Sequence, residues 1–321
     1  MCKTLRLLTC CELLLCMTLV GCHGHSSSPS QITIGTFSHA IDYSPFYVAK
    51  HFGWFEVDPR LHGIKINYKE FNDRAEISAA IETNQVDAIF AAEPPIILTS
   101  AQGNDIRIVE DSCILQQEIV VRSSLPIHSV VDLRHRTIAV MLGTSSHYGL
   151  FKILRASHLD PDKDVQIRYM GPDEARAAFE SGQIDAWAVW PPFVEQEEVS
   201  GAGRVLTGGD AVINSVMAIP EDVLKKDEPI ARAMVEVIQQ SKEWIRKHPD
   251  EAENVVASEL RLNLSVIQAA WGKHDWSAHL TDPVLSDIQQ KADFLAEQKL
   301  TRNNKDVQVR RDLVDLRYSP Q

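Results

Sequence analysis

Cysteine is almost absent from this sequence beyond residue 22. Five of the six cysteines lie within the first 22 residues, and Cys113 stands alone in the rest of the chain. A zinc site or a redox pair needs several cysteines or histidines at short spacing, so the main part of the chain has no such site. Cys113 lies in the apolar stretch CILQQEIVV, where a cysteine usually behaves as a small buried residue. We expect neither a metal nor a cofactor.

Clusters of basic residues are also lacking. The formal net charge is −12, and no basic cluster is larger than a pair such as Arg310-Arg311. A protein that neutralises phosphates needs a basic face, so we expect no nucleic-acid partner. With 321 residues, 44% of them hydrophobic, the chain is long enough for two domains with cores of their own.

Apolar runs long enough to cross a bilayer are missing after the N-terminus. There, Lys3 and Arg6 precede the apolar run Leu13–Val20, which ends in LVGC at Cys22. This start resembles a bacterial lipoprotein signal, which implies cleavage before Cys22 and a lipid on that cysteine. A transmembrane helix is one alternative, which the short run and Glu12 disfavour. A soluble secreted protein with a free cysteine is the other.

These features predict an exported protein, in the periplasm or at the cell surface, anchored to a membrane through Cys22. Which membrane carries the anchor stays open. The expected parts are a signal peptide (1–21), a flexible tether (22–30), lobe 1 with the C-terminal helices (31–118 plus 217–321) and lobe 2 (119–216).

An internal repeat organises the rest of the sequence. Residues 79–96 (AAIETNQVDAIFAAEPPI) and 177–193 (AAFESGQIDAWAVWPPF) are identical at six of their first twelve aligned positions. Each copy reads as an amphipathic helix, a turn and an apolar strand stopped by Pro-Pro. Since other strands also alternate with helices, the pattern predicts parallel βαβ units in two similar lobes.

The remaining elements follow the same patterns. We expect strands at Ile32–Phe37, Ile64–Phe71, Ile106–Val109, Ile114–Val121, Thr137–Leu142, Val165–Met170 and Val212–Ile219, and helices at Ser44–Phe52, Tyr148–Ala156 and Ile230–Ile245. Ile114–Val121 and Val212–Ile219 are expected at the edges of the second half, carrying the chain out of lobe 1 and back. The helical block after Pro220 is expected to cover lobe 1, and Val307–Tyr318 has no assignment.

Four loops follow strands and lead into helices: Ser38–Tyr43, Glu93-Pro94, Thr144–His147 and Trp190-Pro191. Ligands of open α/β sheets bind beyond the carboxyl ends of the strands. If the two lobes face one another, all four loops meet at a cleft that closes on a small ligand by hinge motion.

The loop Gly143-Thr144-Ser145-Ser146-His147 is the most informative of the four. Its three hydroxyls and the free N–H groups of the following helix can hold an oxyanion without a formal positive charge. The alternative is an ordinary N-cap, in which Thr144 or Ser145 satisfies its own helix.

Trp190 and Glu93 each have two interpretations. Of Trp187 and Trp190, alternation places one in the core, and we expect Trp190 at the cleft, where it would cover an alkyl chain or exclude water. Core filling is the alternative. Glu93 either binds a ligand amine or caps the helix that follows it.

Several motifs together resemble the solute-binding proteins of bacterial ABC importers for aliphatic sulfonates, taurine and nitrate. They are the lipoprotein-like start, ITIGTF, QVDAIFAAEPPI, TIAVMLGTSSHYGLF, ARAAFESGQIDAWAVWPPF, WIRKHPDEA and VRRDLVDLRY, and the likeness spans Gln31–Tyr318. The resemblance implies an α/β, type II periplasmic-binding-protein fold with a cleft between two βα lobes and two crossing strands. It also implies a monomer that delivers its ligand to a permease and an ATPase.

The same resemblance assigns residues to the pocket. Thr144–His147 would hold the anionic head, while Ser38, His39, Asp42, Tyr43 and Glu93 would complete the pocket from the other lobe. The chain has Trp190-Pro191-Pro192 where Trp-Asp-Pro is common, and the missing carboxylate disfavours taurine unless Glu93 or Asp42 substitutes for it.

The leading hypothesis is therefore a binding protein for a small oxyanion, foremost an aliphatic sulfonate. One alternative is an enzyme on the same fold, because fold does not fix function. It is disfavoured because no nucleophile and base have diagnostic spacing, and His147 beside Ser145 is not a triad. The others are importer binding proteins for taurine, for nitrate, or for a pyrimidine or thiamine precursor stacked on Trp190.

Overall fold

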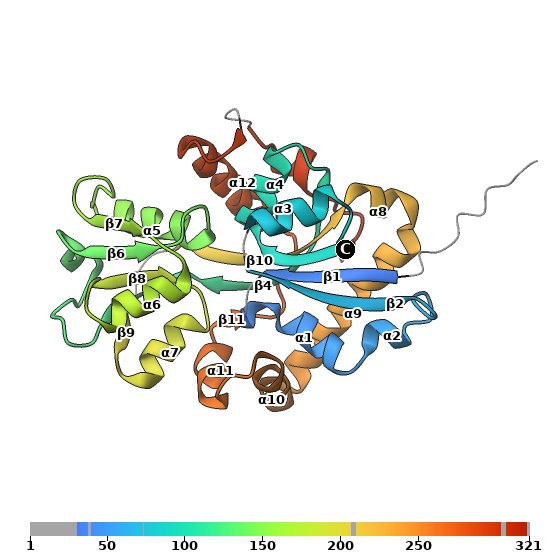
Figure 1. Ribbon diagram of the computed structural model, residues 1–321, viewed down its shortest axis with the longest axis horizontal. Helices are drawn as coiled ribbons and strands as arrows, with labels where there is room; N and C mark the ends of the chain where they lie inside the picture. The colour runs from blue at the N-terminus through green and yellow to red at the C-terminus, as the bar shows by residue number, and fades with distance from the viewer. Residues whose placement is uncertain (1–30, 38–39, 73, 207–209, 303–305, 320–321) are drawn as a thin grey trace, which may run out of the picture.

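A computed structural model of the protein describes residues 31–37, 40–72, 74–206, 210–302 and 306–319. The predicted signal peptide, the tether, Cys22, Ser38 and His39 lie outside the described residues. Two β-sheets lie side by side along the long axis of the molecule, each with helices on both faces (Figure 1). We call the six-stranded sheet with the helices packed on it lobe 1, and the five-stranded sheet with its helices lobe 2.

The sheet of lobe 1 has the order β11-β4-β10-β3-β1-β2. Its strands are β1 (Gln31–Phe37), β2 (Lys65–Phe71), β3 (Ala88–Ala92), β4 (Ile106–Gln116), β10 (Val212–Pro220) and β11 (His274–Asp275). β1 pairs in parallel with β2 and β3, whereas β10 is antiparallel to both β3 and β4.

The sheet of lobe 2 has the order β7-β6-β8-β5-β9. Its strands are β5 (Glu118–Arg122), β6 (Thr137–Val140), β7 (Gln166–Tyr169), β8 (Ala186–Val189) and β9 (Gly203–Leu206). β6 is parallel to β7 and β8, and β5 is antiparallel to β8 and β9. Without β11, the two sheets have the same topology, because β2-β1-β3-β10-β4 of lobe 1 corresponds to β7-β6-β8-β5-β9 of lobe 2. The fourth strand of this order, β10 in lobe 1 and β5 in lobe 2, is antiparallel to its neighbours and belongs to a segment that crosses between the lobes.

The chain crosses from lobe 1 to lobe 2 at Gln117, between β4 and β5. The backbone N–H of Gln117 donates to Ala211 O at 2.9 Å, which joins the outgoing segment to the returning one. The predicted strand Ile114–Val121 is thus divided between two sheets, and β4 is much longer than the predicted Ile106–Val109. β10 pairs only within lobe 1, so it does not lie at an edge of lobe 2 as expected, and the predicted domain boundary after residue 216 falls inside it.

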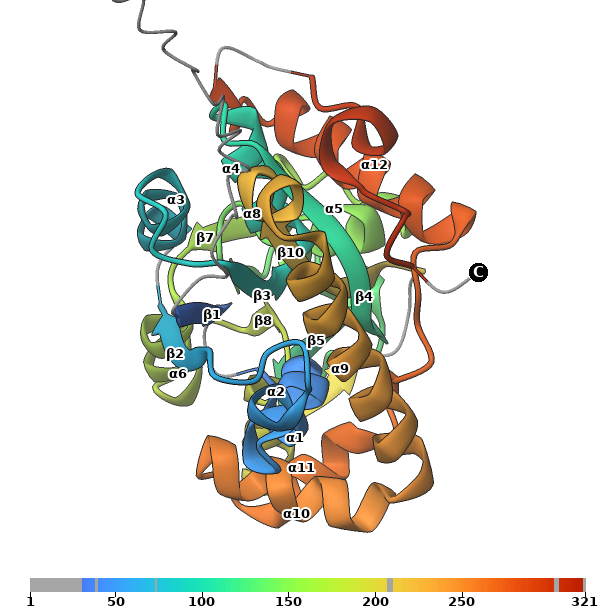
Figure 2. The same cartoon turned by 90° about the vertical axis from the view of Figure 1, so that its right-hand side faces the viewer.

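Helices cover both faces of each sheet. In lobe 1 they are α1 (Ser44–His51), α2 (Trp54–Val57), α3 (Arg74–Glu82), α4 (Glu93–Ala101), α8 (Glu221–Lys226), α9 (Glu228–Lys247), α10 (Pro249–Leu260), α11 (Leu264–Trp271) and α12 (Asp282–Glu297). In lobe 2 they are α5 (Ser145–Ala156), α6 (Pro172–Glu180) and α7 (Phe193–Ser200). Figure 2 shows α4 and α12 on one side of the lobe 1 sheet and α1, α10 and α11 on the other.

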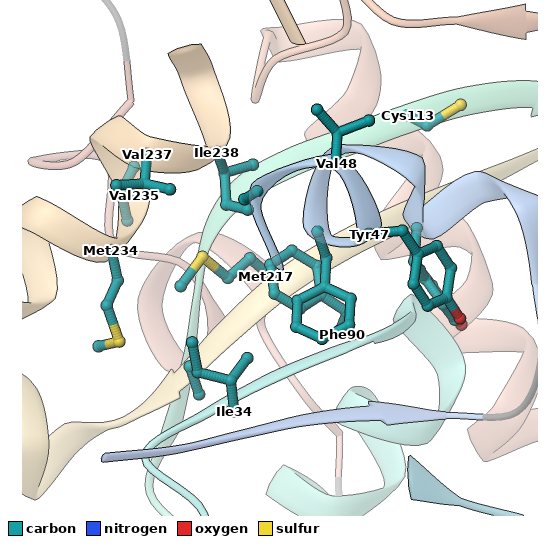
Figure 3. Packing of buried hydrophobic residues seen from close by; sticks show 14 of the residues in the cluster. Ile34, Tyr47, Val48, Phe90, Cys113, Met217, Met234, Val235, Val237 and Ile238 are labelled. Carbon is teal, nitrogen blue, oxygen red and sulfur yellow. The ribbon is translucent and has the colours of Figure 1, made fainter. Parts of the chain in front are cut away.

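Each face of the lobe 1 sheet has its own core. On one face, β3 and β10 pack against α1, α9 and α10. Figure 3 shows part of this core, with Phe90 and Met217 from the sheet and Val48 and Ile238 from the helices that cover it. α3, α4, α12 and the C-terminal segment, which includes a π-helical turn at Val309–Leu313, cover the opposite face. The helical block after Pro220 covers lobe 1, as the sequence pattern predicts.

The repeated aspartate has the same role in both lobes. Asp87 Oδ2 accepts a hydrogen bond from Thr33 N at 2.7 Å, and Asp185 Oδ2 accepts one from Thr137 N at 3.0 Å. The backbone N–H of each aspartate donates to the carbonyl of the same threonine, at 2.8 Å in both cases. The duplicated sequence therefore fixes the turn between helix and strand to the first strand of its lobe.

No helix within the described ranges is long and apolar enough to span a membrane.

Replacing either repeated aspartate should destabilise its lobe. We expect Asp87→Ala and Asp185→Ala each to lower the free energy of unfolding by about 1–3 kcal/mol, because a partly buried N–H loses its acceptor. Urea unfolding followed by tryptophan fluorescence measures this loss. Glu180→Ala is the control, because Glu180 is also identical in both copies but is exposed, and it should change stability little. Equal stability of all three variants would contradict the assignment.

Candidate ligand-binding site

A cavity lies where the two lobes meet and encloses about 360 Å³, a volume that includes space open to solvent. Lobe 1 contributes the ends of β1 and β3, the turn Ile41–Tyr43 and β10, and lobe 2 contributes the start of α5 and the loop after β8. The lining residues are Phe37, Asp42, Tyr43, Ala92, Pro95, Thr144, Ser145, Ser146, Trp190 and Ile213. The cavity thus lies beyond the carboxyl ends of parallel strands in both lobes, where ligands of α/β sheets bind.

The N-terminus of α5 forms the polar wall from lobe 2. Thr144 is its N-cap: Oγ1 accepts a hydrogen bond from His147 N at 3.3 Å and donates one to Met141 O at 2.7 Å. The Thr144 hydroxyl is therefore occupied, as in the ordinary N-cap considered as the alternative. The Ser146 hydroxyl is buried and has no partner among the described residues. As the first residues of the helix, Ser145 and Ser146 also present backbone N–H groups that have no acceptor within α5.

Glu93 lies behind this wall instead of lining the cavity. Its side chain is fully buried and accepts a hydrogen bond from Ser145 Oγ at 2.7 Å. Its carboxylate also forms an ion pair with Lys291 of α12 and accepts a bond from Asn214 Nδ2 at 3.0 Å. Lys291 bonds Asp287 at 2.6 Å as well. Glu93 is therefore a positioning residue that fixes Ser145 across the lobes, and the structure gives it no free oxygen for a ligand amine.

Asp42 lies on the lobe 1 wall and is only 2% exposed. Its Oδ2 accepts a hydrogen bond from Ser215 Oγ, and its Oδ1 has no partner among the described residues. Burial raises the pKa of Asp42 to about 6, although the bond from Ser215 acts in the opposite direction. The adjacent Tyr43 also lines the cavity.

The His147 side chain does not line the cavity, although Thr144, Ser145 and Ser146, which precede it, do. The ring packs edge-on against Phe151, Tyr169 and Phe294. Its Nδ1 accepts a hydrogen bond from Gly143 N at 3.4 Å, and its Nε2 lies 3.3 Å from the Tyr169 hydroxyl. Burial lowers the pKa of His147 to about 4, so the ring is neutral at pH 7. The structure therefore gives this histidine a packing role.

Trp190 lines the cavity, whereas Trp187 is buried in the core of lobe 2, which is the arrangement predicted from alternation. Trp190 and Phe37 also line a neighbouring groove with about 830 Å³ of empty space, which includes the cation Arg176. No lysine or arginine from the described ranges lines the cavity itself.

Six of the predicted site residues line the cavity, and a seventh supports it from behind. The six are Asp42, Tyr43, Thr144, Ser145, Ser146 and Trp190, and Glu93 holds Ser145 in place. Ser38 and His39 lie outside the described residues. Sequence reasoning missed Phe37, Pro95, Ile213, Ser215, Asn214 and Lys291. Lys291 did carry a signal, because it lies on the apolar face of α12 between Ile288 and Leu295, where an unpaired lysine is costly.

Comparison with known proteins places the chain among binding proteins. Residues 40–252 match the family model described as NMT1/THI5 like. The chain is 25% identical over 306 residues to a Bacillus subtilis (strain 168) protein named as a candidate aliphatic sulfonates-binding protein, covering 92% of this chain and 91% of that protein.

Solved structures give the same result. The periplasmic aliphatic sulphonate binding protein SsuA from Escherichia coli matches with TM-score 0.78 and 26% identity, covering 89% of this chain and 97% of that one. The alkanesulfonate-binding protein SsuA from Xanthomonas axonopodis pv. citri bound to MOPS matches with TM-score 0.77 and 24% identity, covering 89% and 99%. The predicted two-lobed periplasmic-binding-protein fold is therefore confirmed.

The ion pair behind the α5 wall should be essential for stability. Lys291→Met leaves the Glu93 carboxylate buried without its cation, and we expect a loss of about 3–5 kcal/mol in the free energy of unfolding. The double variant Glu93→Gln/Lys291→Met should lose less, because it leaves no charge at position 93. Chemical denaturation measures both.

The matched control is Lys225→Met, which removes an ion pair between Lys225, 72% exposed, and Glu221. It should cost less than about 1 kcal/mol. A Lys291→Met variant as stable as this control would show that the buried pair does not support the site.

Proposed function

Since the chain belongs to the NMT1/THI5-like family, we propose that it is the extracytoplasmic binding component of an ABC importer and captures a small oxyanion, foremost an aliphatic sulfonate. It would bind the ligand in the cavity between the lobes and deliver it to a permease and an ATPase. In this proposal the protein is a monomer and not an enzyme.

The observation that carries the proposal is the unpartnered, buried Ser146 hydroxyl at the N-terminus of α5. A buried hydroxyl without a hydrogen bond is costly, so a bound acceptor would stabilise it. The positive end of the helix dipole and the first backbone N–H groups favour an anion at the same place. Together these neutral donors suit the oxygens of a singly charged head group.

The rest of the lining favours an alkyl chain on that head group. Phe37, Ala92, Pro95, Trp190 and Ile213 are apolar and contribute half of the residues around the cavity. Burial of an alkyl chain against such surfaces contributes about 0.8 kcal/mol per CH₂ group. Nitrate and sulfate carry no such chain, so they leave this surface unused. The names of the relatives in B. subtilis and E. coli point to the same ligand class.

A catalytic role has little support from the side chains near the site. Burial raises the pKa of the Cys113 thiol well above its usual value, so this cysteine is not a ready nucleophile. The neutral His147 ring is enclosed by aromatic side chains. No group of three or more His, Cys, Asp or Glu side chains among the described residues could hold a metal ion. Binding remains the function that we propose.

We also propose that Cys22 anchors the mature protein to a membrane, with residues 22–30 as its tether. Lobe 1 would contain most of residues 31–118 and the C-terminal helices, and lobe 2 would move against it about the crossing at Gln117.

The anchor is tested by incorporation of a radiolabelled fatty acid in a bacterial host. We expect label in the wild-type protein and none in Cys22→Ser, because the lipid attaches to the cysteine that follows the cleavage site. Cys16→Ser is the control and should keep the label, since Cys16 lies within the segment that is removed. Equal labelling of both variants would show that Cys22 is not the lipidated residue.

The binding proposal is tested with a panel of alkanesulfonates, taurine, nitrate, sulfate and a thiamine-type pyrimidine. A ligand that binds only the folded state raises the melting temperature, and we expect the largest shift from a sulfonate. Ser146→Ala should weaken the binding of that ligand by about 1.5–3 kcal/mol, which is a loss of affinity of roughly 10- to 100-fold. Calorimetry measures the affinity. The double variant Ser145→Ala/Ser146→Ala should abolish binding, because Ser145 also loses its bond to Glu93.

Ser112→Ala is the matched control. Ser112 is also a buried serine whose hydroxyl lacks a partner among the described residues, but it does not line the cavity. It should leave the affinity unchanged. Full affinity in Ser146→Ala would remove the oxyanion argument, and a larger shift with the pyrimidine would favour that ligand class instead.

A further inference from the structure

We propose that Asp42 forms a second polar subsite, which accepts a hydrogen bond from a cationic group at the far end of the ligand. The preferred ligand class is then a zwitterion with an anionic head and an ammonium tail, such as an aminoalkanesulfonate. This inference rests on the proposed function, which supplies the binding site for the head group.

The first observation is the position of the free oxygen. Asp42 Oδ1 belongs to a side chain that is 2% exposed and lines the cavity, and it has no partner within the described part of the chain. The other oxygen, Oδ2, is held by Ser215 of β10, so the orientation of the carboxyl group is fixed. A buried acceptor that is oriented by one bond and lacks a second is suited to a donor that arrives with the ligand.

The second observation is the distribution of charge around the cavity. Asp42 comes from lobe 1, while the donors of Ser146 come from lobe 2, so the two walls have opposite polarity. The buried lysines of the described residues are already paired, Lys291 with Glu93 and Asp287, and Lys242 with Glu110. Because no lysine or arginine lines the cavity in the described residues, the ligand itself is the available source of positive charge.

The buried Asp42 carboxylate also disfavours a ligand that carries no cation. An alkanesulfonate would place a negative charge and an apolar tail near the Asp42 carboxylate, which would then be buried without compensation. Such a ligand binds well only when Asp42 is protonated. An ammonium group has the opposite effect, because it favours the carboxylate.

Protonation of Asp42 can be assigned from its surroundings. Four ionisable groups interact electrostatically with Asp42. They are Tyr43 of its own turn, Tyr47 of α1, Glu93 of α4 and Cys113 of β4. Burial raises the pKa of both tyrosines and of the cysteine, so these groups stay neutral below pH 8, and Glu93 is paired with Lys291. Within this set, Asp42 is the group that titrates between pH 5 and pH 7.5, since its pKa is about 6.

The test compares two probes of equal size, 3-aminopropane-1-sulfonate and butane-1-sulfonate, by calorimetry on the wild-type protein. At pH 7.5 we expect the amino compound to bind at least tenfold more tightly. On lowering the pH to 5, its affinity should fall roughly tenfold, because most Asp42 side chains become protonated. The affinity for butane-1-sulfonate should rise over the same range. These opposite slopes need no variant and therefore do not depend on whether a variant folds.

Asp42→Asn should remove the preference for the amino compound and flatten both pH profiles. The amide keeps the shape of the side chain and an oxygen that can accept the bond from Ser215. Asp111→Asn is the matched control, since Asp111 is a fully buried carboxyl with unpartnered oxygens that does not line the cavity. It should retain both slopes and the preference.

The outcomes separate the two proposals. If butane-1-sulfonate binds as tightly as the amino compound at pH 7.5, the Asp42 subsite is wrong while the proposed function stands. If neither sulfonate binds at either pH, the proposed function fails, and the Asp42 inference fails with it.

Discussion

The buried carboxylate of Glu93 is the interaction on which the site depends. It joins α4, α12 and β10 of lobe 1 to the first turn of α5 in lobe 2, through Lys291, Asn214 and Ser145. An isolated carboxylate at this depth would be costly, so the network is stable only when Lys291 is present. Ser145 donates its hydroxyl to this network, which leaves Ser146 and the helix N-terminus to face the cavity. The Ser145 hydroxyl thus joins the lobes, whereas the Ser146 hydroxyl and the first N–H groups of α5 have no partner within the helix and are available to a ligand.

Under the proposed function, this separation lets an acidic protein offer a site for an anion. The attraction would come from helix N–H groups and a hydroxyl, whose partial charges act at short range, and not from a cationic side chain. Lys291 is close to the site but neutralised by Glu93 and Asp287. The neutral donors of α5 lie opposite a single acid, Asp42. Such a site would select among ligands by their shape and by the positions of their charges more than by their net charge.

Much of this arrangement follows from the sequence. The repeat predicted two similar lobes, and its conserved spacing is explained by Asp87 and Asp185, which bind the first strand of each lobe. The role of His147 could not be read from its loop, because the direction of its ring depends on where Phe294 of α12 docks. The pairing of Glu93 with Lys291, 198 residues away, required the same long-range information. The strand break at Gln117 was hidden because the apolar pattern continues through it, although Gln116 and Gln117 are a polar pair at the crossing.

The contacts that span the lobes differ in how strongly they can hold the cleft closed. Arg155 and Glu297 are 49% and 57% exposed, and such a pair contributes at most about 1 kcal/mol. Lys273, beside β11, instead reaches three carboxylates of lobe 2, at 2.8 Å from Glu118, 2.9 Å from the buried Glu195 and 3.4 Å from Glu198. This cluster lies next to the crossing at Gln117, where a hinge motion would move the chain least. Beside the cavity, the bond from Ser145 to Glu93 is joined by an apolar contact between α5 and α12, made by Tyr148, Phe151 and Phe294, and by a bond from the Tyr148 hydroxyl to Gln290 at 3.1 Å. In the proposed function, closure therefore depends on these contacts of α5 with lobe 1 together with the contacts that the ligand adds to both walls.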